Sequence, residues 1–549
     1  FRWELFWLCL RWWLDCLGIK ELSKLQAVIN ICNDKYHTDI TFQNIVQSGL
    51  DDPKVYQLLQ KGYTQNIFQF SSKGMTKFLV SMQPDKIEDL IAANALFRPA
   101  TLDSGSTDKY VDCKLGDADP VYLWGTYNAM KNTYGVLCYQ EQLAQIAREV
   151  GKFSLGEGVK LVKLISKKKV DKILALRDKF MAGANENGCP KEDAEAIWHM
   201  FEVAGGYLFN KSHATAYAVT AYAGAYLKAN YPTAFYTIAL QWAKDDEIPT
   251  LMSEMELCSE AKIVPPDINV SGGTFITDYE TNKIFWSLSR IKMLGAKATE
   301  WIINERNVRG EFSSIENFIE RIFRYKLKQY KYWDDPDNPN EVTKCPVNAR
   351  HVRHLILSGC FDKVENAQSV IERYAILEKA AKCLGFEISE KDIPEDLRNK
   401  HYFWSQQQIA ISGIGAIDYK RIYDNSEAKP KIKGKASWAL LKNIQDPDYD
   451  GKRVAICANI VDIEEKKFKD KKTGENRVFC KLLLQQNNDL VEMVIWNDEW
   501  MNVRATLCKG GSLSSAKSKM LICSAQVKYS DYTGGNNLQL YKSSIIDIL

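Results

Sequence analysis

The spacing of apolar residues changes along this sequence, and this change constrains the fold more than any other feature. From residue 20 to residue 250 the apolar positions repeat with the period of a helix, about 3.6 residues, and few strong breakers interrupt them. After Gly451 they alternate in short runs separated by turn-forming segments, which is typical of strands. The sequence therefore predicts a multidomain, mainly α protein that ends in a small β domain.

Length and composition agree with several folded domains. The chain has 549 residues, and at roughly 100–200 residues per domain we expect three to five domains. With 46% hydrophobic and 26% charged residues, global disorder is excluded. The 72 basic and 69 acidic side chains nearly balance, so a site for a polyanion has to come from local clustering of positive charge.

The cysteines and the apolar segments indicate in which cellular compartment the protein works. The 14 cysteines are scattered and none forms a C-x-x-C pair, which indicates a reducing compartment and not a disulfide scaffold. The sequence contains no run of about 18 or more apolar residues, the length needed to span a membrane. The apolar N-terminal segment is interrupted by charges and lacks a small-residue cleavage site, so we expect no signal peptide. Because the chain begins with Phe1 and not Met, we expect it to be part of a longer polypeptide.

The same patterns predict particular elements. Helices are expected over residues 86–97, 125–151 and 212–230, and Pro232 is expected to begin another. Residues 283–291 alternate like a strand, and residues 292–310 resemble two helices joined across Leu294-Gly295. Residues 325–345 are predicted to be an exposed loop and residues 425–450 a linker, because both are rich in Lys, Pro or Asp. Five short strands after residue 451 are typical of a small β-barrel of the oligonucleotide-binding (OB) type.

The segment with the most functional information is GGYLFNKSHATAYAVTAYAGAYLKANYPTAFYTIAL, residues 205–240. Asn210, Lys211, Ser212 and His213 lie where a turn opens an Ala-rich helix. A helix N-terminus has free N–H groups and a positive dipole end, so it favours an anion such as phosphate. In the alternative, Asn210 or Ser212 only caps the helix and His213 packs against it.

A second candidate is the lysine-rich segment 160–180. Its basic residues are Lys160, Lys163, Lys167, Lys168, Lys169, Lys172, Arg177 and Lys179. Only Asp171 and Asp178 oppose them, and a phosphodiester backbone would explain so dense a positive stripe. An ordinary solvated helix face is the alternative.

Two further candidates lie in the second half of the chain. The predicted turn at Met293–Ala296 would expose backbone N–H groups to a phosphate, with Leu294, Gly295 and Lys297 against DNA. In the β domain, bases could stack on aromatic side chains beside a basic loop. The aromatic residues are Phe479, Trp496 and Tyr529, and the loop lysines are Lys466, Lys467, Lys469, Lys471 and Lys472. Burial of these aromatic residues inside the barrel is the alternative.

One apparent metal pattern is rejected. Cys345, His351, His354 and Cys360 fall close together, but their spacing is not a familiar zinc arrangement. The sequence also contains no Walker-type glycine loop, no HExxH and no Ser/His/Asp order.

Eight blocks then follow one another in a fixed order over residues 14–362. They are LDCLGIKEL (14–22), NIFQFSSKGMTKFL (66–79), ANALFRPATL (93–102), TYGVLCYQEQL (133–143), GYLFNKSHATAYA (206–218), VPPDIN (264–269), IKMLGAKATEWIINER (291–306) and SGCFD (358–362). In this order the chain resembles the C-terminal half of the alpha subunit of bacterial DNA polymerase III, a C-family replicative polymerase.

The resemblance implies a domain arrangement. It consists of a palm remnant over 1–20, helical fingers over 21–250, a helix-hairpin-helix domain that contacts duplex DNA and the sliding clamp over 251–365, a helical connector and linker over 366–450, and an OB-fold nucleic-acid-binding domain over 451–549.

The activity that the resemblance implies is DNA-directed DNA synthesis. A primer 3′-hydroxyl attacks a deoxynucleoside triphosphate while two Mg²⁺ ions hold the attacking and leaving oxygens. Asp15 matches the family's third palm carboxylate and would be a catalytic metal ligand. The Asp-x-Asp pair that precedes it in the family is not in this sequence, so we expect negligible primer extension from this chain alone. A separate N-terminal polymerase fragment would have to supply the other two carboxylates.

The resemblance also implies the residues that neutralise triphosphate and template charge. These are Arg98, Lys163, Lys167, Lys168, Lys211, Ser212 and His213. The sequence departs from the family at three places. Trp13 replaces a lysine, Val162-Lys163 replaces an Arg-Arg pair, and Ala100 replaces a glycine. No clean Gln-x-x-Leu-Phe clamp-binding peptide follows the hairpin domain.

The partners implied are primer-template DNA, deoxynucleoside triphosphates, a sliding clamp and other replisome subunits, in the cytoplasm of a bacterial or phage-infected cell. A non-catalytic DNA-binding subunit that uses the hairpin and OB modules is the alternative function. A degenerate product, with poor folding of the first twenty residues, is a third interpretation.

Overall fold

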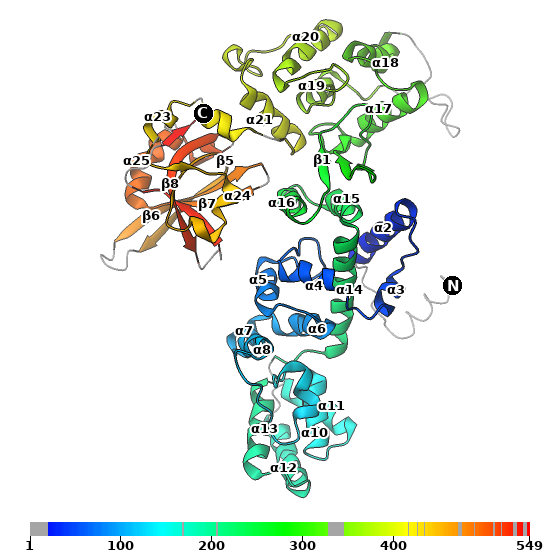
Figure 1. Ribbon diagram of the computed structural model, residues 1–549, viewed down its shortest axis with the longest axis vertical. Coiled ribbons are helices and arrows are strands. Elements are labelled where there is room, and N and C mark those ends of the chain that lie inside the picture. The colour runs from blue at the N-terminus through cyan, green and yellow to red at the C-terminus, as the bar shows by residue number, and fades with distance from the viewer. Residues whose placement is uncertain are drawn as a thin grey trace. The chain divides into compact units, whose positions relative to one another are not determined.

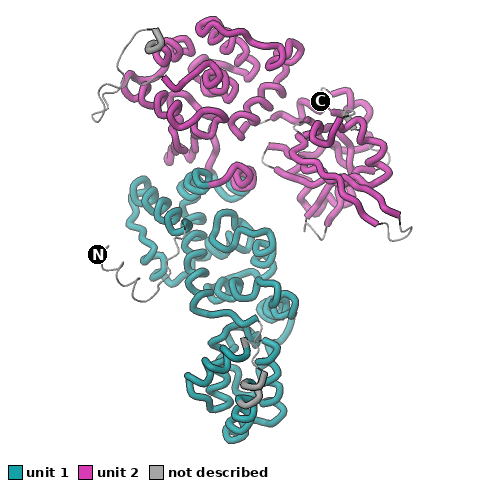
Figure 2. The backbone as a smooth tube through the Cα atoms, turned by 180° about the vertical axis from the view of Figure 1, so that it is seen from behind, with its two compact units in different colours: residues 1–242, 254–260 teal, residues 243–253, 261–549 magenta. Residues whose placement is uncertain are grey.

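Figure 1 shows the computed structural model of the protein. It describes residues 20–166, 170–204, 207–327, 345–415, 417–424, 426–432, 434–469, 475–487, 489–508, 511–517, 519–530, 535–541 and 546–548. The chain divides into two compact units, residues 1–242 with 254–260, and residues 243–253 with 261–549 (Figure 2). Asp15, Lys167, Lys168, Lys471 and Lys472 lie outside the described residues, as do most of the predicted palm remnant and of the predicted loop 325–345.

The first unit is helical throughout its described residues. Its α-helices are α2 (Lys20–Lys35), α3 (Phe42–Gln47), α4 (Pro53–Gln60), α5 (Lys73–Met82), α6 (Ile87–Leu96), α7 (Pro99–Asp103), α8 (Ser106–Leu115), α9 (Tyr127–Met130), α10 (Gln140–Glu149), α11 (Leu155–Ser166), α12 (Val170–Glu186), α13 (Lys191–Ala204), α14 (Lys211–Asn230), α15 (Pro232–Trp242) and the end of α16 (Ile248–Cys258). The predicted helices at 86–97 and 212–230 are confirmed, and Pro232 does begin a helix.

Helix α14 organises the first unit. It packs against α2, α3, α4, α6 and α15 (Figure 1). Its buried positions are mostly alanine and glycine, from Ala214 through Ala218 to Gly224 and Ala225. Small side chains let neighbouring helices approach closely, so one helix can contact five others.

A second hydrophobic core of this unit lies among α10, α11, α12 and α13, around Phe180, Trp198 and Phe201. The prediction of one helix over 125–151 is wrong here. The chain is helical only in α9, a short 3₁₀ turn and α10, with Tyr134 and Gly135 at positive φ between them. The buried Gln142 side chain accepts hydrogen bonds from the N–H groups of Cys138 and Tyr139 (2.9 and 2.8 Å), which stabilises the break.

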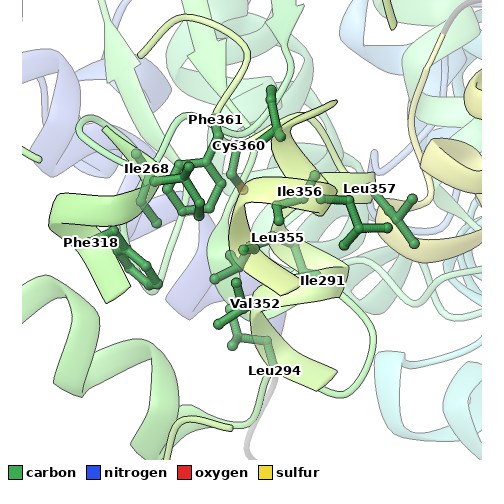
Figure 3. Packing of buried hydrophobic residues seen from close by; sticks show 14 of the residues in the cluster. Ile268, Ile291, Leu294, Phe318, Val352, Leu355, Ile356, Leu357, Cys360 and Phe361 are labelled. Carbon is green, nitrogen blue, oxygen red and sulfur yellow. The ribbon is translucent and has the colours of Figure 1, made fainter. Parts of the chain in front are cut away.

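The second unit contains a small three-stranded sheet that is followed along the chain by helices. Its elements up to residue 424 are β1 (Lys262–Val264), β2 (Ile276–Asp278), β3 (Lys283–Phe285), η2 (Leu288–Arg290), α17 (Ala296–Arg309), α18 (Ile315–Leu327), α19 (Ala349–Leu357), η3 (Val370–Glu372), α20 (Arg373–Leu384), η4 (Glu395–Leu397), α21 (His401–Ser412) and α22 (Tyr419–Asp424). Strand β3 lies between β1 and β2. The core includes Ile291, Leu294, Phe318 and Leu355 (Figure 3).

Two predictions for this region are corrected. The strand predicted over 283–291 ends at Phe285 and is followed by the 3₁₀ turn η2. Residues 292–310 contain one α-helix, α17, preceded by a turn, and not two helices. The chain turns before α17 because Met293 adopts a positive φ of 70° and Leu294 is drawn into the core.

The C-terminal part is a sheet with the strands that the alternation predicts. Its elements are β4 (Ser437–Trp438), β5 (Arg453–Lys469), β6 (Asn476–Gln486), β7 (Asp489–Ile495), α25 (Asn497–Cys508), η6 (Leu513–Ala516), β8 (Met520–Ser530), β9 (Gly535–Gln539) and β10 (Ile546–Ile548). The hydrogen-bonded order is β10-β8-β9-β7-β6-β5-β4, and β8 also pairs with β5. The pairing therefore runs from β5 through β6, β7, β9 and β8 back to β5.

The segment predicted to be a linker, 425–450, is folded onto this sheet. It contains α23 (Ala428–Ile432), α24 (Leu441–Ile444) and the 3₁₀ turn η5 (Pro447–Tyr449). Ile432, Leu441 and Ile444 are completely buried in the cores of the sheet. The many charged residues between these apolar positions made the segment resemble a linker in the sequence.

The described cysteines are all free thiols. None of the helices in the described ranges combines the length and the apolar character needed to cross a bilayer.

A close backbone contact in the first unit gives a stability prediction. A Cβ atom on Gly183 of α12 would overlap the carbonyl group of Gly151. Because a backbone carbonyl cannot rotate away, we expect Gly183→Ala to lower the free energy of unfolding by about 2–3 kcal/mol. Urea unfolding followed by helical circular dichroism measures this.

Gly156→Ala is the matched control, since a Cβ atom there meets nothing within 4 Å at the exposed start of α11. We expect a gain of about 0.5 kcal/mol from the less flexible unfolded chain. An equal loss in both variants would contradict the packing argument.

Candidate functional site

A pocket of about 600 Å³ in the first unit contains two of the predicted phosphate-binding residues. It lies beside the start of α14, the end of α6 and the loop before α5. Its lining residues are Gln69, Ser71, Ser72, Met75, Asn94, Phe97, Arg98, Phe209, His213 and Tyr217. None of these described lining residues is acidic, and most of the polar ones can donate hydrogen bonds.

Arg98 is held rigidly in this pocket by neutral groups. Its position before Pro99 favours the extended backbone observed there, with φ −147° and ψ 152°. Its guanidinium donates to the carbonyl oxygens of Ala95 (2.8 and 3.0 Å) and Tyr207 (2.7 Å), and lies over the ring of Phe209 at 4.3 Å.

The charge of Arg98 is not compensated by a carboxylate among the residues that the structure describes. Burial lowers the pKa of Arg98 from its usual value, because desolvation disfavours the charged form. Arginine nevertheless stays protonated in proteins. A fixed, partly desolvated cation facing a pocket without acidic lining favours an anionic ligand.

His213 lies in the same pocket on the first turn of α14. Its ring packs on Tyr217, with 4.1 Å between ring centroids, and meets the edge of Phe209 at 5.4 Å. The structure therefore brings Arg98 and His213 together, although they are 115 positions apart in the sequence.

The N-terminus of α14 already holds a carboxylate. Asn210 caps the helix, because its Oδ1 accepts from the N–H of His213 at 2.8 Å. Glu141 accepts hydrogen bonds from the N–H of Lys211 (2.9 Å) and the side-chain amide of Asn210 (3.1 Å). The capping alternative is thus observed at Asn210, and the amide of Lys211, where a phosphate was expected, binds Glu141.

Other predicted site residues lie outside the pocket lining. The ammonium of Lys211 is 5.6 Å from the ring centroid of Tyr139, and Ser212 is exposed on the same turn. Lys163 is exposed on α11, because Leu161, Val162 and Ile165 form the buried side of that helix.

The sequence interpretation missed the loop that completes the pocket. Gln69 adopts a positive φ of 63°, and Ser72 caps α5 by accepting from the N–H of Met75 at 3.3 Å. Gln69, Ser71 and Ser72 fall in the block 66–79, and Asn94 in the block 93–102. These blocks signalled a shared region, but not which side chains line a cavity.

The turn before α17 differs from the prediction. The side chain of Leu294 is 3% exposed and points into the core of Figure 3. The N–H of Leu294 donates to Ile291 O (3.0 Å) and that of Gly295 to Met293 O (3.1 Å). These two N–H groups are hydrogen-bonded within the turn and are therefore not free to bind a phosphate. Lys297, in contrast, is exposed on the first turn of α17.

Three aromatic rings form a cluster at one end of the C-terminal sheet, here called the aromatic cluster. The ring centroids of Phe479 and Trp496 are 5.3 Å apart, and the ring centroid of Phe468 lies 5.7–5.8 Å from both. Trp496 is 41% exposed, so it is not buried inside the sheet. Lys466, Lys467 and Lys469 are exposed on β5, and Lys466 is paired in register with Phe479. Tyr529 is exposed on β8 and outside the cluster.

No group of three or more His, Cys, Asp or Glu side chains among the described residues could hold a metal ion. Of the four residues in the apparent metal pattern, His354 contacts the carbonyl of Lys292 through Nδ1 (2.6 Å) and Cys360 is buried. Asp15 lies outside the described residues.

Comparison with known proteins identifies the family of the chain. Residues 21–188 match a protein-family model described as "Bacterial DNA polymerase III alpha subunit finger domain", and residues 260–332 match "Helix-hairpin-helix motif". The chain is a C-family alpha-like protein. Both pocket-bearing segments 66–79 and 93–102 of this alpha-like chain fall inside the finger match.

Its relatives are named "DNA polymerase III subunit alpha". The relative from Aquifex aeolicus is 34% identical over 67% of this chain and 30% of its own length, and that from Thermus aquaticus is 32% identical over 64% and 27%. The relative from Pseudomonas aeruginosa is 27% identical over 96% of this chain and 45% of its own length. The alpha-like chain thus spans less than half the length of these relatives.

The cap of α14 gives a testable prediction. Asn210→Ala removes the acceptor for the N–H of His213, and we expect the free energy of unfolding to fall by about 1 kcal/mol. Urea unfolding of the first unit measures the loss. Ser212→Ala, on the same exposed turn, should stay within about 0.5 kcal/mol of the wild type. Equal losses would mean that Asn210 is not the cap.

Proposed function

We propose that this chain takes part in template-directed DNA synthesis in the bacterial cytoplasm, as the fingers-to-C-terminal part of an alpha-like polymerase. The observation that carries the proposal is Arg98, a rigid cation without a carboxylate partner among the described residues, in a pocket with His213. The finger-domain match covers Arg98, and the relatives are named as polymerase subunits. The pocket volume lies within the range of about 300–1,000 Å³ that is usual for small-molecule sites.

In this proposal the pocket binds the triphosphate of an incoming deoxynucleotide. Arg98 forms charge-assisted hydrogen bonds to phosphate oxygens, and His213 donates a further one. The hydroxyl groups of Ser71 and Ser72 supply neutral donors, while Phe209 and Tyr217 provide apolar walls. Lys163 and Lys211, which do not line the pocket, contribute longer-range attraction for the triphosphate or template.

Phosphoryl transfer in this family is expected to use two Mg²⁺ ions that hold the attacking and leaving oxygens. The described residues do not form a ligand set for these ions. The role that we propose for this chain's own side chains is therefore to bind and orient the nucleotide.

The second unit would hold DNA. The cyclic strand pairing and the helix between β7 and β8 support an OB-type barrel, with the aromatic cluster as a stacking surface and the lysines of β5 beside it. The hairpin domain over 251–365 would contact duplex DNA through exposed cations such as Lys297, and a sliding clamp and other replisome subunits would be its partners. A non-catalytic DNA-binding subunit is the alternative, and nucleotide binding distinguishes the two.

Nucleotide binding is tested at Arg98. We expect Arg98→Gln to weaken binding of deoxyadenosine triphosphate by about tenfold or more, because hydrogen bonds to charged groups contribute about 1.5–3 kcal/mol. Binding of the uncharged nucleoside should change little. Equilibrium dialysis with the full 549-residue chain measures both affinities, and circular dichroism checks the fold.

Lys191→Gln is the control for net charge, since Lys191 is exposed on α13 and does not line the pocket. It should leave the triphosphate affinity unchanged. If wild type and Arg98→Gln bound the triphosphate equally, the pocket would not be the nucleotide site and the DNA-holding alternative would gain support.

DNA binding is tested at Trp496. Stacking of a base on an aromatic side chain contributes about 1–3 kcal/mol, so Trp496→Ala should weaken binding of a single-stranded oligodeoxythymidylate about tenfold. Met501→Ala, an exposed apolar residue on α25 outside the aromatic cluster, is the control. Fluorescence anisotropy measures both, and equal affinities for the two variants would remove the cluster from the DNA interface.

A further inference from the structure

Lys228 is a buried cation on α14, the helix that also carries His213. Its side chain is completely buried, and its ammonium uses three hydrogen bonds. Two go to the backbone carbonyls of Tyr63 (3.0 Å) and Gln65 (2.8 Å), and the third goes to the carboxylate of Glu254. An ammonium has three N–H donors, so this environment satisfies Lys228 fully.

Glu254 completes the arrangement from α16. One of its oxygens accepts from the backbone N–H of Gln65 at 3.0 Å. The other accepts from Lys228 and from the hydroxyl of Tyr236 at 2.9 Å. The ion pair therefore holds both backbone groups of one residue, because Lys228 binds the carbonyl of Gln65 and Glu254 binds its N–H.

Gln65 belongs to the loop that forms one wall of the pocket. The loop joins α4 to α5 and supplies Gln69, Ser71 and Ser72 to the lining. Asn66 adopts a positive φ of 59° in this loop, as Gln69 does. Residues other than glycine keep such a backbone only where the surroundings hold it.

A buried ion pair is a poor means of stabilising a fold. Desolvation of both charges offsets most of their attraction, and apolar residues of similar size often serve as well. Burial lowers the pKa of Lys228, and the neighbouring Glu254, with a smaller effect of Cys258, opposes that shift. The distinctive property of this pair is the set of backbone groups that it holds, all of them in the pocket loop or next to it.

We propose that Lys228 and Glu254 are positioning residues for the nucleotide pocket: they hold the loop 63–72 in the conformation that presents Gln69, Ser71 and Ser72 to the ligand. The proposal rests on the proposed function of that pocket. Neither residue lines the pocket, so both act through the backbone of the loop.

The test compares Lys228→Met with a matched variant of another buried ion pair in the same unit. Lys114 is 4% exposed and pairs with the buried Asp89 at 2.8 Å, and neither residue lines the pocket. Lys114→Met should therefore destabilise the unit without releasing the loop. Both variants are made in the full 549-residue chain and studied well below their melting temperatures.

Two measurements are made on each variant. We expect Lys228→Met to weaken deoxyadenosine triphosphate binding about tenfold, by analogy with the lower end of the loss measured when a residue that orients a metal ligand is removed. We also expect amide hydrogen exchange to accelerate in residues 63–72. Lys114→Met should change neither, although its melting temperature also falls.

Glu254→Gln is the second variant, in case Lys228→Met does not fold. The amide can still accept from Lys228 and Tyr236, but its NH₂ group now faces the N–H of Gln65. We expect the same two changes to a smaller extent.

The outcomes separate the two proposals. Unchanged affinity and loop protection in Lys228→Met and Glu254→Gln, or equal changes in Lys114→Met, would overturn the positioning role. If the wild-type chain bound no triphosphate, the proposed function would fail, and hydrogen exchange would still show whether the pair holds the loop.

Discussion

The close packing of α14 is the constraint on which the first unit depends. Alanine and glycine at its buried positions allow five helices to pack against it. Because it is one continuous helix, the distance between its ends is set by about 1.5 Å per residue. His213 at its start and Lys228 near its end are therefore fixed relative to each other. The pocket and the loop that completes it share this one support.

The buried cations of the first unit have two kinds of surroundings. Lys228 and Lys114 each have a carboxylate partner, so their charges are compensated within the protein. Arg98 instead contacts carbonyl groups and a phenyl ring, and keeps its charge available to a ligand. Glu141 has the opposite effect at α14, since its carboxylate occupies the amide of Lys211. In the proposed function, anion binding therefore falls to Arg98 and not to the helix end.

In the second unit, apolar packing decides which groups of the helix-hairpin-helix region and of the C-terminal sheet remain accessible. Leu294 is drawn into the hairpin core, and the amides of the turn bond to its own carbonyls. Cations such as Lys297 remain exposed there. In the C-terminal sheet Trp496 stays exposed next to Phe479, because both lie at the end of strands and not on the packed face. The sheet therefore carries exposed aromatic rings beside the lysines of β5, whereas the hairpin part offers exposed cations alone.

The sequence by itself determined the helical first half, the strands after residue 451, the helix opened by Asn210 and the family resemblance. These follow from local periodicity, capping chemistry and the order of short blocks, which need no knowledge of distant contacts. It did not determine the break at Tyr134, the folded segment 425–450 or the bonding of Glu141 to α14. Each of these depends on a partner far away in the chain or on burial against another element. The resemblance grouped Arg98 with His213, but only the tertiary structure placed them in one pocket and Lys228 against Gln65. Such contacts arise from helix packing, which produces no periodic pattern in the sequence.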